Sequence, residues 1–256
     1  MEKVSKTENW KNAFPKENRY FETNNGILYC ADCIDILRQI PENSVDLVLT
    51  DPPYGVNSNE RNGIDYKDNF YNVDAVSKEL FRTLKDNTRT FIFTAQKTFL
   101  NVVEYFTSNS FNLHQTLIWL HPNLTGGTKK KVYDFTSVYE QIILFHKGKP
   151  QKLKKAEGFF NFDVLKYPQP QSNFKKDKRQ HIHQKPVNLI EHLILVTTNE
   201  NDLVLDPFLG SGTTAVVCEK LNRRWIGIEI NSNYCEMAKE RLLYPTRQNP
   251  KMKILI

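Results

Sequence analysis

The tetrapeptide Asp51-Pro52-Pro53-Tyr54 directly follows an apolar run, residues 45–50, that is typical of a buried strand. Consecutive prolines hold a backbone rigid and have no N–H, so their carbonyl oxygens stay available as hydrogen-bond acceptors. Asp51 adds an ionised acceptor, and Tyr54 adds a ring on which a flat heterocycle can stack. This turn therefore suits an exocyclic amine with two N–H donors. Taken alone, it is equally an ordinary Asp-Pro turn that closes a strand.

A second segment has the order strand, glycine loop, helix. Residues 201–206 predict a buried strand, residues 207–214 read Pro-Phe-Leu-Gly-Ser-Gly-Thr-Thr, and residues 215–221 predict a helix. Glycines let the backbone approach a ligand closely, and the unpaired N–H groups at a helix start favour a negative charge. About 20 residues further on, the predicted strand 224–229 ends in an acid, the spacing at which such folds hydrogen-bond a ribose hydroxyl. Glu229 is therefore a ribose candidate, and a purely structural turn is the alternative.

Together the two segments resemble the DNA amino-methyltransferases, which move a methyl group from S-adenosylmethionine to an exocyclic base nitrogen. The family's catalytic motif, Asp/Asn/Ser-Pro-Pro-Tyr/Phe, is matched by residues 51–54, and its cofactor loop is matched by residues 206–214. The catalytic motif comes first along the chain, as in the family's beta subgroup. The resemblance covers most of the chain outside the first twenty or so residues, the basic middle segment and the last dozen.

The resemblance implies a set of site residues. Asp32 and Cys33 match the family's N-terminal turn that holds the adenine of the cofactor, although Ala31 stands where glycine is usual. His183 and Lys185 match the motif that opens the helix flanking the methionine end. The implied catalytic residues are Asp51, Pro52, Pro53 and Tyr54. The implied cofactor-binding residues are Asp32, Cys33, His183, Lys185, Asp206, Phe208, Gly210, Ser211, Gly212, Thr213 and Glu229.

The acid at the first motif position favours adenine as the target. In the family, aspartate there usually accompanies methylation of adenine N6, and serine usually accompanies methylation of cytosine N4. Asp51 therefore predicts N6 methylation in double-stranded DNA, with cytosine N4 as the alternative because its amine offers the same geometry. The amine is unreachable inside a duplex, so the base must be flipped out and stacked, here on Tyr54.

Positive charge is concentrated in one segment. The chain carries a formal net charge of +6, and residues 147–181 alone contain ten Lys or Arg against three acids. Five Phe or Tyr are interleaved with these basic residues. Basic residues with aromatics can neutralise phosphates and wedge into a duplex. We interpret residues 147–181 as a short target-recognition insertion that contacts DNA, and the alternative is a solvated, lysine-rich surface loop.

Alternating strand and helix patterns predict an α/β fold with a doubly wound, mostly parallel sheet, the Rossmann-like methyltransferase fold. The 256 residues are expected to form a single domain, 1–256, that contains the basic insertion. No apolar run of eighteen residues and no signal core is found, so we expect a soluble, cytoplasmic protein without membrane contact. The four cysteines lack the spacing of a zinc site, and no metal is expected. The predicted strands are 27–30, 45–50, 90–94, 113–120, 138–145, 201–206 and 224–229, and the predicted helices are 34–40, 73–84, 98–106, 186–196 and 215–221.

Other functions use only part of this pattern. A nicotinamide or flavin dehydrogenase explains the glycine loop and Glu229 but leaves residues 51–54 and the basic segment unexplained. A non-catalytic DNA-binding partner needs none of the intact motifs. Methylation of RNA or of a protein glutamine is related chemistry, but the acid, the motif order and the size favour DNA. The resemblance also implies a homodimer and a cognate restriction endonuclease as partners.

Overall fold

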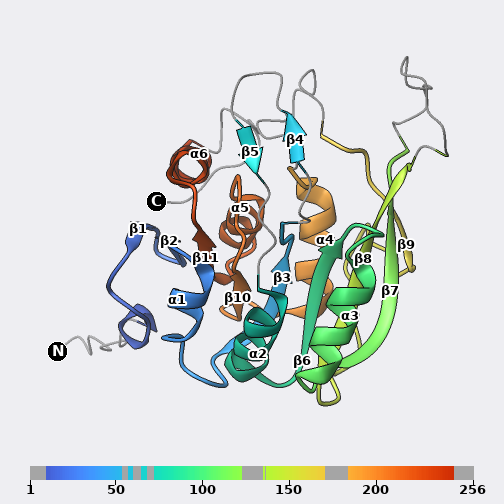
Figure 1. Ribbon diagram of the computed structural model, residues 1–256, viewed down its shortest axis with the longest axis horizontal. Helices are drawn as coiled ribbons and strands as arrows, with labels where there is room; N and C mark the ends of the chain where they lie inside the picture. The colour runs from blue at the N-terminus through green and yellow to red at the C-terminus, as the bar shows by residue number, and fades with distance from the viewer. Residues whose placement is uncertain are drawn as a thin grey trace.

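The computed structural model describes residues 10–53, 57–59, 65–67, 72–122, 135, 137–170 and 184–244, and it contains a nine-stranded and a two-stranded sheet (Figure 1). The strands are β1 (Arg19–Glu22), β2 (Gly26–Cys30), β3 (Val45–Thr50), β4 (Asn57–Asn59), β5 (Asp65–Lys67), β6 (Leu84–Thr94), β7 (Asn112–Leu120), β8 (Tyr139–Lys147), β9 (Val164–Lys166), β10 (Leu203–Asp206) and β11 (Arg224–Glu229). The helices are η1 (Trp10–Ala13, a 3-10 helix), α1 (Cys33–Leu37), α2 (Val73–Thr83), α3 (Phe99–Ser108), α4 (Val187–Thr197), α5 (Thr213–Lys220) and α6 (Ser232–Leu243). In the described part, no helix has the length and apolar character needed to cross a membrane.

The larger sheet is doubly wound and mostly parallel, which confirms the predicted fold class. Its strand order is β1-β2-β11-β10-β3-β6-β8-β7-β9. The central strands β2, β11, β10, β3 and β6 are parallel, whereas β1 and β8 pair antiparallel with their neighbours. β7 is antiparallel to β8 and so runs in the direction of β6, and β9 is parallel to β7. The carboxyl ends of the parallel strands share one edge, the upper edge in Figure 1, where open α/β sheets bind ligands.

Alternation along β3 divides the core into two layers. Leu47 and Leu49 pack in a cluster with α4, α5 and α6, whereas Val48 packs in a second cluster with α1, α2 and α3. Successive side chains of a strand point to opposite faces, so a strand buried on both sides reads as an almost continuous apolar run. This is why residues 45–50 were recognisable as a strand, and why Figure 1 shows helices on both faces of the sheet.

Several short elements were not predicted. β1, η1 and β9 have three or four residues each, too few for a periodic pattern to emerge. β6 begins at Leu84, immediately after α2, rather than at the predicted Thr90, because its first half is polar and only its second half is fully buried. The segment 57–70 was expected to lack regular structure, but it contains the antiparallel pair of β4 and β5.

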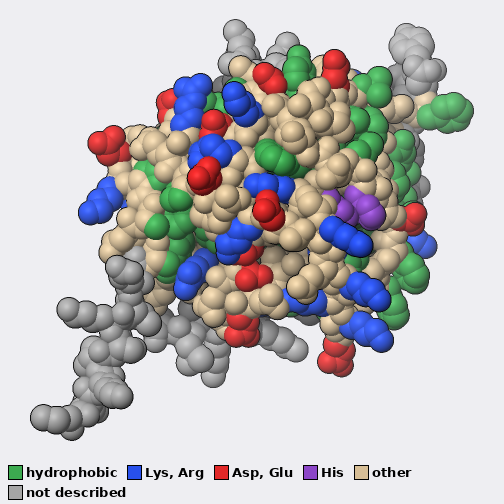
Figure 2. All heavy atoms as spheres, turned by 90° about the horizontal axis from the view of Figure 1, so that it is seen from below, with side chains coloured by type: hydrophobic (Ala, Val, Ile, Leu, Met, Phe, Trp, Pro, Cys, Tyr) green, Lys and Arg blue, Asp and Glu red, His purple; other side chains and the backbone are tan. Residues whose placement is uncertain are grey.

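The edge opposite the strand ends carries the start of the basic segment. β8 runs away from the carboxyl edge and ends at Lys147, whose Nζ donates to the carbonyl oxygens of Leu84 at 2.7 Å and Phe81 at 3.0 Å. Lys154 Nζ likewise donates to the Thr198 carbonyl oxygen at 2.6 Å, at the end of α4. Seen from below, this side of the molecule mixes basic and acidic side chains and is not uniformly positive (Figure 2). These two lysines therefore bind the protein's own backbone.

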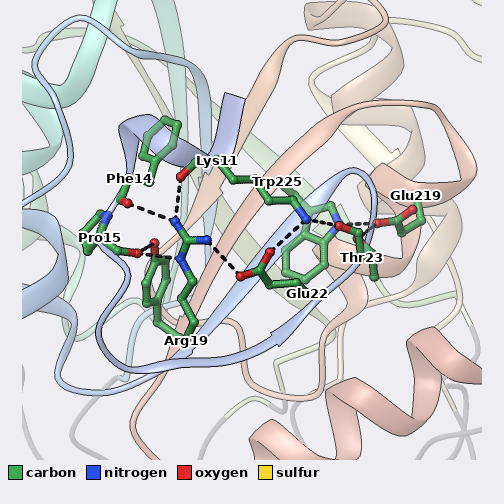
Figure 3. Close-up of polar contacts among 9 residues, drawn as sticks. Lys11, Phe14, Pro15, Arg19, Glu22, Thr23, Glu219 and Trp225 are labelled. Carbon is green, nitrogen blue, oxygen red and sulfur yellow. Dashed lines mark hydrogen bonds and ion pairs between the residues drawn. The ribbon is translucent and has the colours of Figure 1, made fainter. Parts of the chain in front are cut away.

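The N-terminal segment is fastened to the sheet by one arginine (Figure 3). Arg19 donates to the carbonyl oxygens of Pro15 at 2.7 Å, Lys11 at 2.6 Å and Phe14 at 3.0 Å, and it pairs with Glu22 at 2.9 Å. These contacts hold the segment from Lys11 to Pro15 against β1, the edge strand of the sheet. The first twenty residues, which lie outside the family resemblance, thus include a structural support for the core fold.

Candidate active site

The two predicted motifs meet at the carboxyl edge of the sheet. Asp51 follows β3, Asp206 ends the neighbouring strand β10, and Glu229 ends β11 on its far side. Thr50 Oγ1, one residue before Asp51, donates a hydrogen bond of 2.7 Å to Asp206 Oδ1. The ends of β3 and β10, which carry the two predicted motifs, are therefore joined directly, although 156 positions separate Thr50 and Asp206 in the sequence.

Asp206 is buried, and both of its carboxylate oxygens accept hydrogen bonds from within the protein. Its Oδ1 also accepts from the Phe208 backbone N at 3.2 Å, and its Oδ2 accepts from Thr214 Oγ1 at 2.7 Å. Burial raises the pKa of this carboxyl to about 6, and the hydrogen bonds from Thr214, Thr50 and Phe208 oppose that rise. Asp206 thus fixes the turn between β10 and α5 to the end of β3. Phe208 is half-buried and packs against the core cluster that includes α1, α2 and α3.

The glycine loop needs its two glycines for different reasons. Gly210 has φ of +53° and Gly212 has φ of +83°, a region that residues with a Cβ rarely adopt. A Cβ at Gly212 would lie 2.8 Å from the Cβ of Ala238, so this glycine permits close packing on α6. A Cβ at Gly210 would meet no atom within 4 Å. The backbone at Gly210 therefore borders open space that a ligand can occupy.

Arg241 on α6 holds the same loop from behind, a contact that the sequence reasoning missed. Only 1% of this residue is exposed, and its Nη1 donates to the Ser211 carbonyl oxygen at 2.6 Å, to Ser211 Oγ at 3.0 Å and to Thr213 Oγ1 at 3.1 Å. The polar groups of Ser211 and Thr213 are thus used in holding the loop. A signal was present, because Arg241 falls at helical spacing with the buried Tyr234 and Ala238.

The Glu229 carboxylate accepts hydrogen bonds both from the glycine loop and from the residue that precedes α6. Its Oε2 accepts from the Gly210 backbone N at 2.8 Å, and its Oε1 accepts from the Asn231 backbone N at 2.8 Å. Burial raises the pKa of Glu229, and hydrogen bonds from the backbone at Asn231 and Gly210 oppose this rise. A carboxylate oxygen has more than one acceptor site, so these bonds leave capacity for a ribose hydroxyl. Glu229, the residue predicted to bind the ribose, thus also holds the backbone of Gly210 in place.

The turn after β2 lies beside Glu229. The Ala31 backbone N donates to the Glu229 carbonyl oxygen at 3.1 Å, which places the predicted adenine turn next to the predicted ribose ligand. Asp32 is exposed and caps α1 by accepting from the Ile34 backbone N at 2.8 Å. Cys33 is buried, and burial raises the pKa of its thiol to about 12. The cysteine is therefore a packing residue, and its backbone is what it can offer a ligand.

Lys185 forms an ion pair with Asp51. Its Nζ contacts Asp51 Oδ2 and lies 3.2 Å from Glu140 Oε2, over the rings of Phe93 at 5.0 Å and Trp119 at 5.9 Å. Only 8% of its side chain is exposed. Burial lowers the pKa of Lys185, but the charges of Asp51 and Glu140 outweigh burial and raise it above its ordinary value. Lys185, predicted from the family motif as a cofactor residue, thus bridges two carboxylates. Glu140 was missed because it belongs to no motif.

Two predicted residues, Tyr54 and His183, lie outside the described residues, as does the second half of the basic segment, 171–181. The described half contains exposed Phe160 and Phe162, whose rings stack with centroids 5.9 Å apart. β9 then runs beside β7 toward the carboxyl edge, with Lys166 opposite Leu120. DNA contact by the segment stays a prediction.

The site suits a nucleoside-containing ligand. Glu229 and the Asp32 turn lie at neighbouring strand ends, and the Gly210 backbone borders open space. The described residues contain no group of three or more His, Cys, Asp or Glu that could hold a metal ion. An α/β sheet with an acid after one strand, a glycine loop after the next and an acid after the third defines a class of nucleotide-cofactor enzymes with the ligand at the strand ends.

Comparison with known proteins identifies the family. The family model described as DNA methylase, of the N6/N4 methyltransferases, matches residues 45–240, and the chain belongs to this family. The Type II methyltransferase M.HpaI of Haemophilus parainfluenzae is 32% identical over 242 residues, which cover 84% of this chain and 73% of the relative. M2.MboI of Moraxella bovis is 29% identical over 87% of this chain and 90% of its own length. The predicted resemblance is thus confirmed.

Solved structures of DNA methyltransferases have folds similar to that of this chain. The crystal structure of the M1.HpyAVI–SAM complex has a TM-score of 0.63 and 27% identity, and the match covers 84% of this chain and 98% of that one. The PvuII DNA methyltransferase, described as cytosine-N4-specific, has a TM-score of 0.72 with 21% identity over 91% of this chain and 96% of its own. S-adenosylmethionine is the cofactor of this enzyme, as the motifs predict.

Proposed function

We propose that this chain methylates the N6 amine of adenine in double-stranded DNA, with Asp51 as the residue that grips the amine. The observation that supports this assignment is the place of Asp51 at the strand end next to the cofactor loop, linked to it through Thr50 and Asp206. An acid at this position favours adenine within the family. The PvuII enzyme shares the fold and is described as cytosine-N4-specific, so the fold by itself does not select the base.

S-adenosylmethionine supplies, when bound, an electrophilic methyl group on a sulfonium centre. We assign its ribose to Glu229, its adenine to the turn at Asp32 and Cys33, and its methionine end to the loop at Gly210 with the segment that contains His183. Asp206, Ser211, Gly212 and Thr213 contribute by fixing the loop, as their contacts with Thr50, Arg241 and Ala238 indicate. Phe208 is half-buried, and we assign it to packing on the cofactor.

The protein's task is to make a poor nucleophile attack. The lone pair of an adenine amine is delocalised into the ring. Asp51 and the Pro52 carbonyl oxygen accept the two N–H groups of that amine, which draws the nitrogen toward tetrahedral geometry and aims its lone pair. Positioning and electrostatics then supply most of the rate acceleration. A proton leaves the cationic nitrogen after transfer, and no separate strong base is required.

Access to the amine requires base flipping, at a cost of a few kcal/mol. Tyr54, next to the prolines, is the candidate for stacking on the flipped base. The net charge of +6 and the aromatic and basic residues from β9 onward favour DNA contact near the carboxyl edge. Because M.HpaI and M2.MboI are Type II methyltransferases, we place this enzyme in a restriction-modification system, with a cognate endonuclease. A homodimer and a cytoplasmic location remain predictions.

Mapping of modified bases tests the proposal. The protein is incubated with unmethylated genomic DNA and S-adenosylmethionine, and the products are analysed by single-molecule sequencing and by nucleoside mass spectrometry. We expect N6-methyladenine at one short sequence. N4-methylcytosine refutes the adenine assignment, and absence of modified DNA with retained cofactor binding favours a non-catalytic partner.

The role of Asp51 has its own test. Asp51→Ala removes the carboxylate acceptor, and we expect transfer to fall by at least about a thousandfold, as for loss of a key electrostatic group. Cofactor affinity measured by calorimetry should change little, because Glu229, Gly210 and the turn at Asp32, to which we assign the cofactor, follow other strands. Glu104→Ala, at an exposed acid on α3, serves as the control. Undiminished transfer by the Asp51 variant rules out the role.

A further inference from the structure

Glu140 is a mostly buried acid next to Lys185, and none of the motifs contains it. It is the second residue of β8, and 24% of its side chain is exposed. Its Oε2 lies 3.2 Å from Lys185 Nζ, and Lys185 Nζ also contacts Asp51 Oδ2. One ammonium group therefore bridges two carboxylates, one from the catalytic turn and one from a strand two places away in the sheet.

The charge count of this cluster bears on the chemistry. The amine nitrogen becomes positively charged as it gains the methyl group, so the site must present a net negative charge to it. Asp51 and Lys185 alone sum to zero, and a neutral pair stabilises a developing cation poorly. Glu140 brings the sum to −1. Its presence leaves the negative charge of Asp51 in effect uncancelled.

We propose that Glu140 is a positioning residue for methyl transfer: it neutralises Lys185, so that Lys185 can orient Asp51 without cancelling the charge that Asp51 presents to the amine. The proposal rests on the catalytic role assigned to Asp51 but not on the identity of the methylated base. It assigns Glu140 no contact with the substrate. Glu140 acts through Lys185, and Lys185 acts on Asp51.

Two other titratable groups lie near this cluster, and both are unchanged in the variants compared below. His121 Nε2 lies 3.7 Å from Glu140 Oε1, and burial lowers the pKa of this histidine, which disfavours its charged form. Asp206, on the strand on the other side of Asp51, accepts from two threonine hydroxyls, and its charge interacts with that of Asp51 equally in the wild type and in every variant at Glu140 or Lys185. Phe93 and Trp119 supply ring faces to the ammonium and no full charge. In the described residues, Lys185 is thus the cation that Glu140 balances.

Single substitutions measure the effect of removing the charge. Glu140→Gln keeps the shape of the side chain and brings the cluster to neutrality. We expect the single-turnover rate of methyl transfer, at saturating cofactor and DNA, to fall about 10- to 100-fold, the size expected of one charge at close range in a partly buried site. The dissociation constant for S-adenosylmethionine should stay within about twofold. Glu140→Asp keeps the charge and should retain more of the rate than Glu140→Gln.

A double substitution separates charge balance from support of the fold. Glu140→Gln combined with Lys185→Met removes both charges and leaves Asp51 alone, so the sum returns to −1. We expect this double variant to transfer methyl groups about tenfold faster than Glu140→Gln alone, because the uncancelled Lys185 is gone. A residue that only supports the fold gives no such recovery. Glu104→Gln, at an exposed acid on α3, is the matched control and should behave as the wild type.

The outcomes are decisive in both directions. Recovery of rate in the double variant supports the proposal. Full activity of Glu140→Gln overturns it, as does a folded, cofactor-binding double variant no faster than the single one. If the double variant does not fold, equal rates for Glu140→Asp and Glu140→Gln overturn it. All rates are measured on whichever base the wild type modifies, so an error in the adenine assignment leaves this test intact. An active Asp51→Ala variant identifies failure of the proposed site itself.

Discussion

Asp206→Asn should change how the stability of the protein depends on pH. The carboxyl has a pKa of about 6 in the folded protein, raised from an ordinary 3.8 mainly by burial. Below about pH 4 it is protonated in both the folded and the unfolded chain. Between about pH 4 and 6 the unfolded chain releases this proton while the folded protein retains it, so stability falls as the pH rises. Above about pH 6 both states have lost the proton, and the contribution stops changing.

The expected size follows from the shift. One pKa unit corresponds to about 1.4 kcal/mol, so a shift of about two units removes about 3 kcal/mol of unfolding free energy across this window. Asparagine is neutral at every pH, and its amide oxygen can still accept one hydrogen bond from Thr50 or Phe208. Its own contribution is therefore flat. Other titrating groups, including Glu229, are common to both proteins and cancel in the difference.

The assay is urea unfolding of the wild type and the variant at intervals from pH 4 to pH 7.5. We expect the unfolding free energy of the wild type to fall by about 3 kcal/mol more than that of Asp206→Asn between pH 4 and 7. Asp163→Asn, at an exposed acid, should give a curve parallel to that of the wild type. Parallel curves for Asp206→Asn and the wild type would refute the reasoning, because they mean that the folded protein holds this proton no more tightly than the unfolded chain.

Two further predictions concern the glycine loop to which we assign the cofactor. Arg241→Met removes three donated hydrogen bonds to Ser211 and Thr213, so urea unfolding should show a loss of about 3 kcal/mol, and calorimetry should show weaker binding of S-adenosylmethionine. A folded variant with unchanged affinity contradicts the view that Arg241 orders the loop. Glu229→Ala should weaken cofactor affinity before it affects the transfer rate at saturation, because it removes both the predicted ribose acceptor and the partner of the Gly210 N–H. Unchanged affinity removes the ribose assignment.

The sequence predicted the parts of the site that are local in the chain. Asp51 and Glu229 were identified because each follows a short apolar run, and a run buried on both faces marks a parallel strand whose end lies at the binding edge. The glycine loop was identified by composition. Because the carboxyl ends of parallel strands share one edge, a parallel sheet brings these two acids to that edge whichever strands are neighbours.

The contacts missed by sequence reasoning are those made across the fold. Glu140 belongs to an antiparallel strand, begins no helix and follows no glycine, so its meeting with Lys185 depends on β8 pairing beside β6. Lys147 was counted as a DNA-binding residue on charge, yet it donates to backbone carbonyl oxygens of Phe81 and Leu84. Net charge describes a segment, and it does not tell which of its lysines face solvent.

The partners of the four acids at the catalytic edge indicate which of them can respond to a substrate. Asp206 is held by two hydroxyls and a backbone N–H, and Glu229 by two backbone N–H groups, which are neutral donors fixed by the fold. Asp51 and Glu140 instead share a full positive charge on a flexible side chain. A neutral fixed donor cannot redistribute charge when a cation develops nearby, whereas an ammonium between two carboxylates can shift toward one of them. On the roles we propose, Lys185 between Asp51 and Glu140 is therefore the part of the site that can respond when an amine engages Asp51.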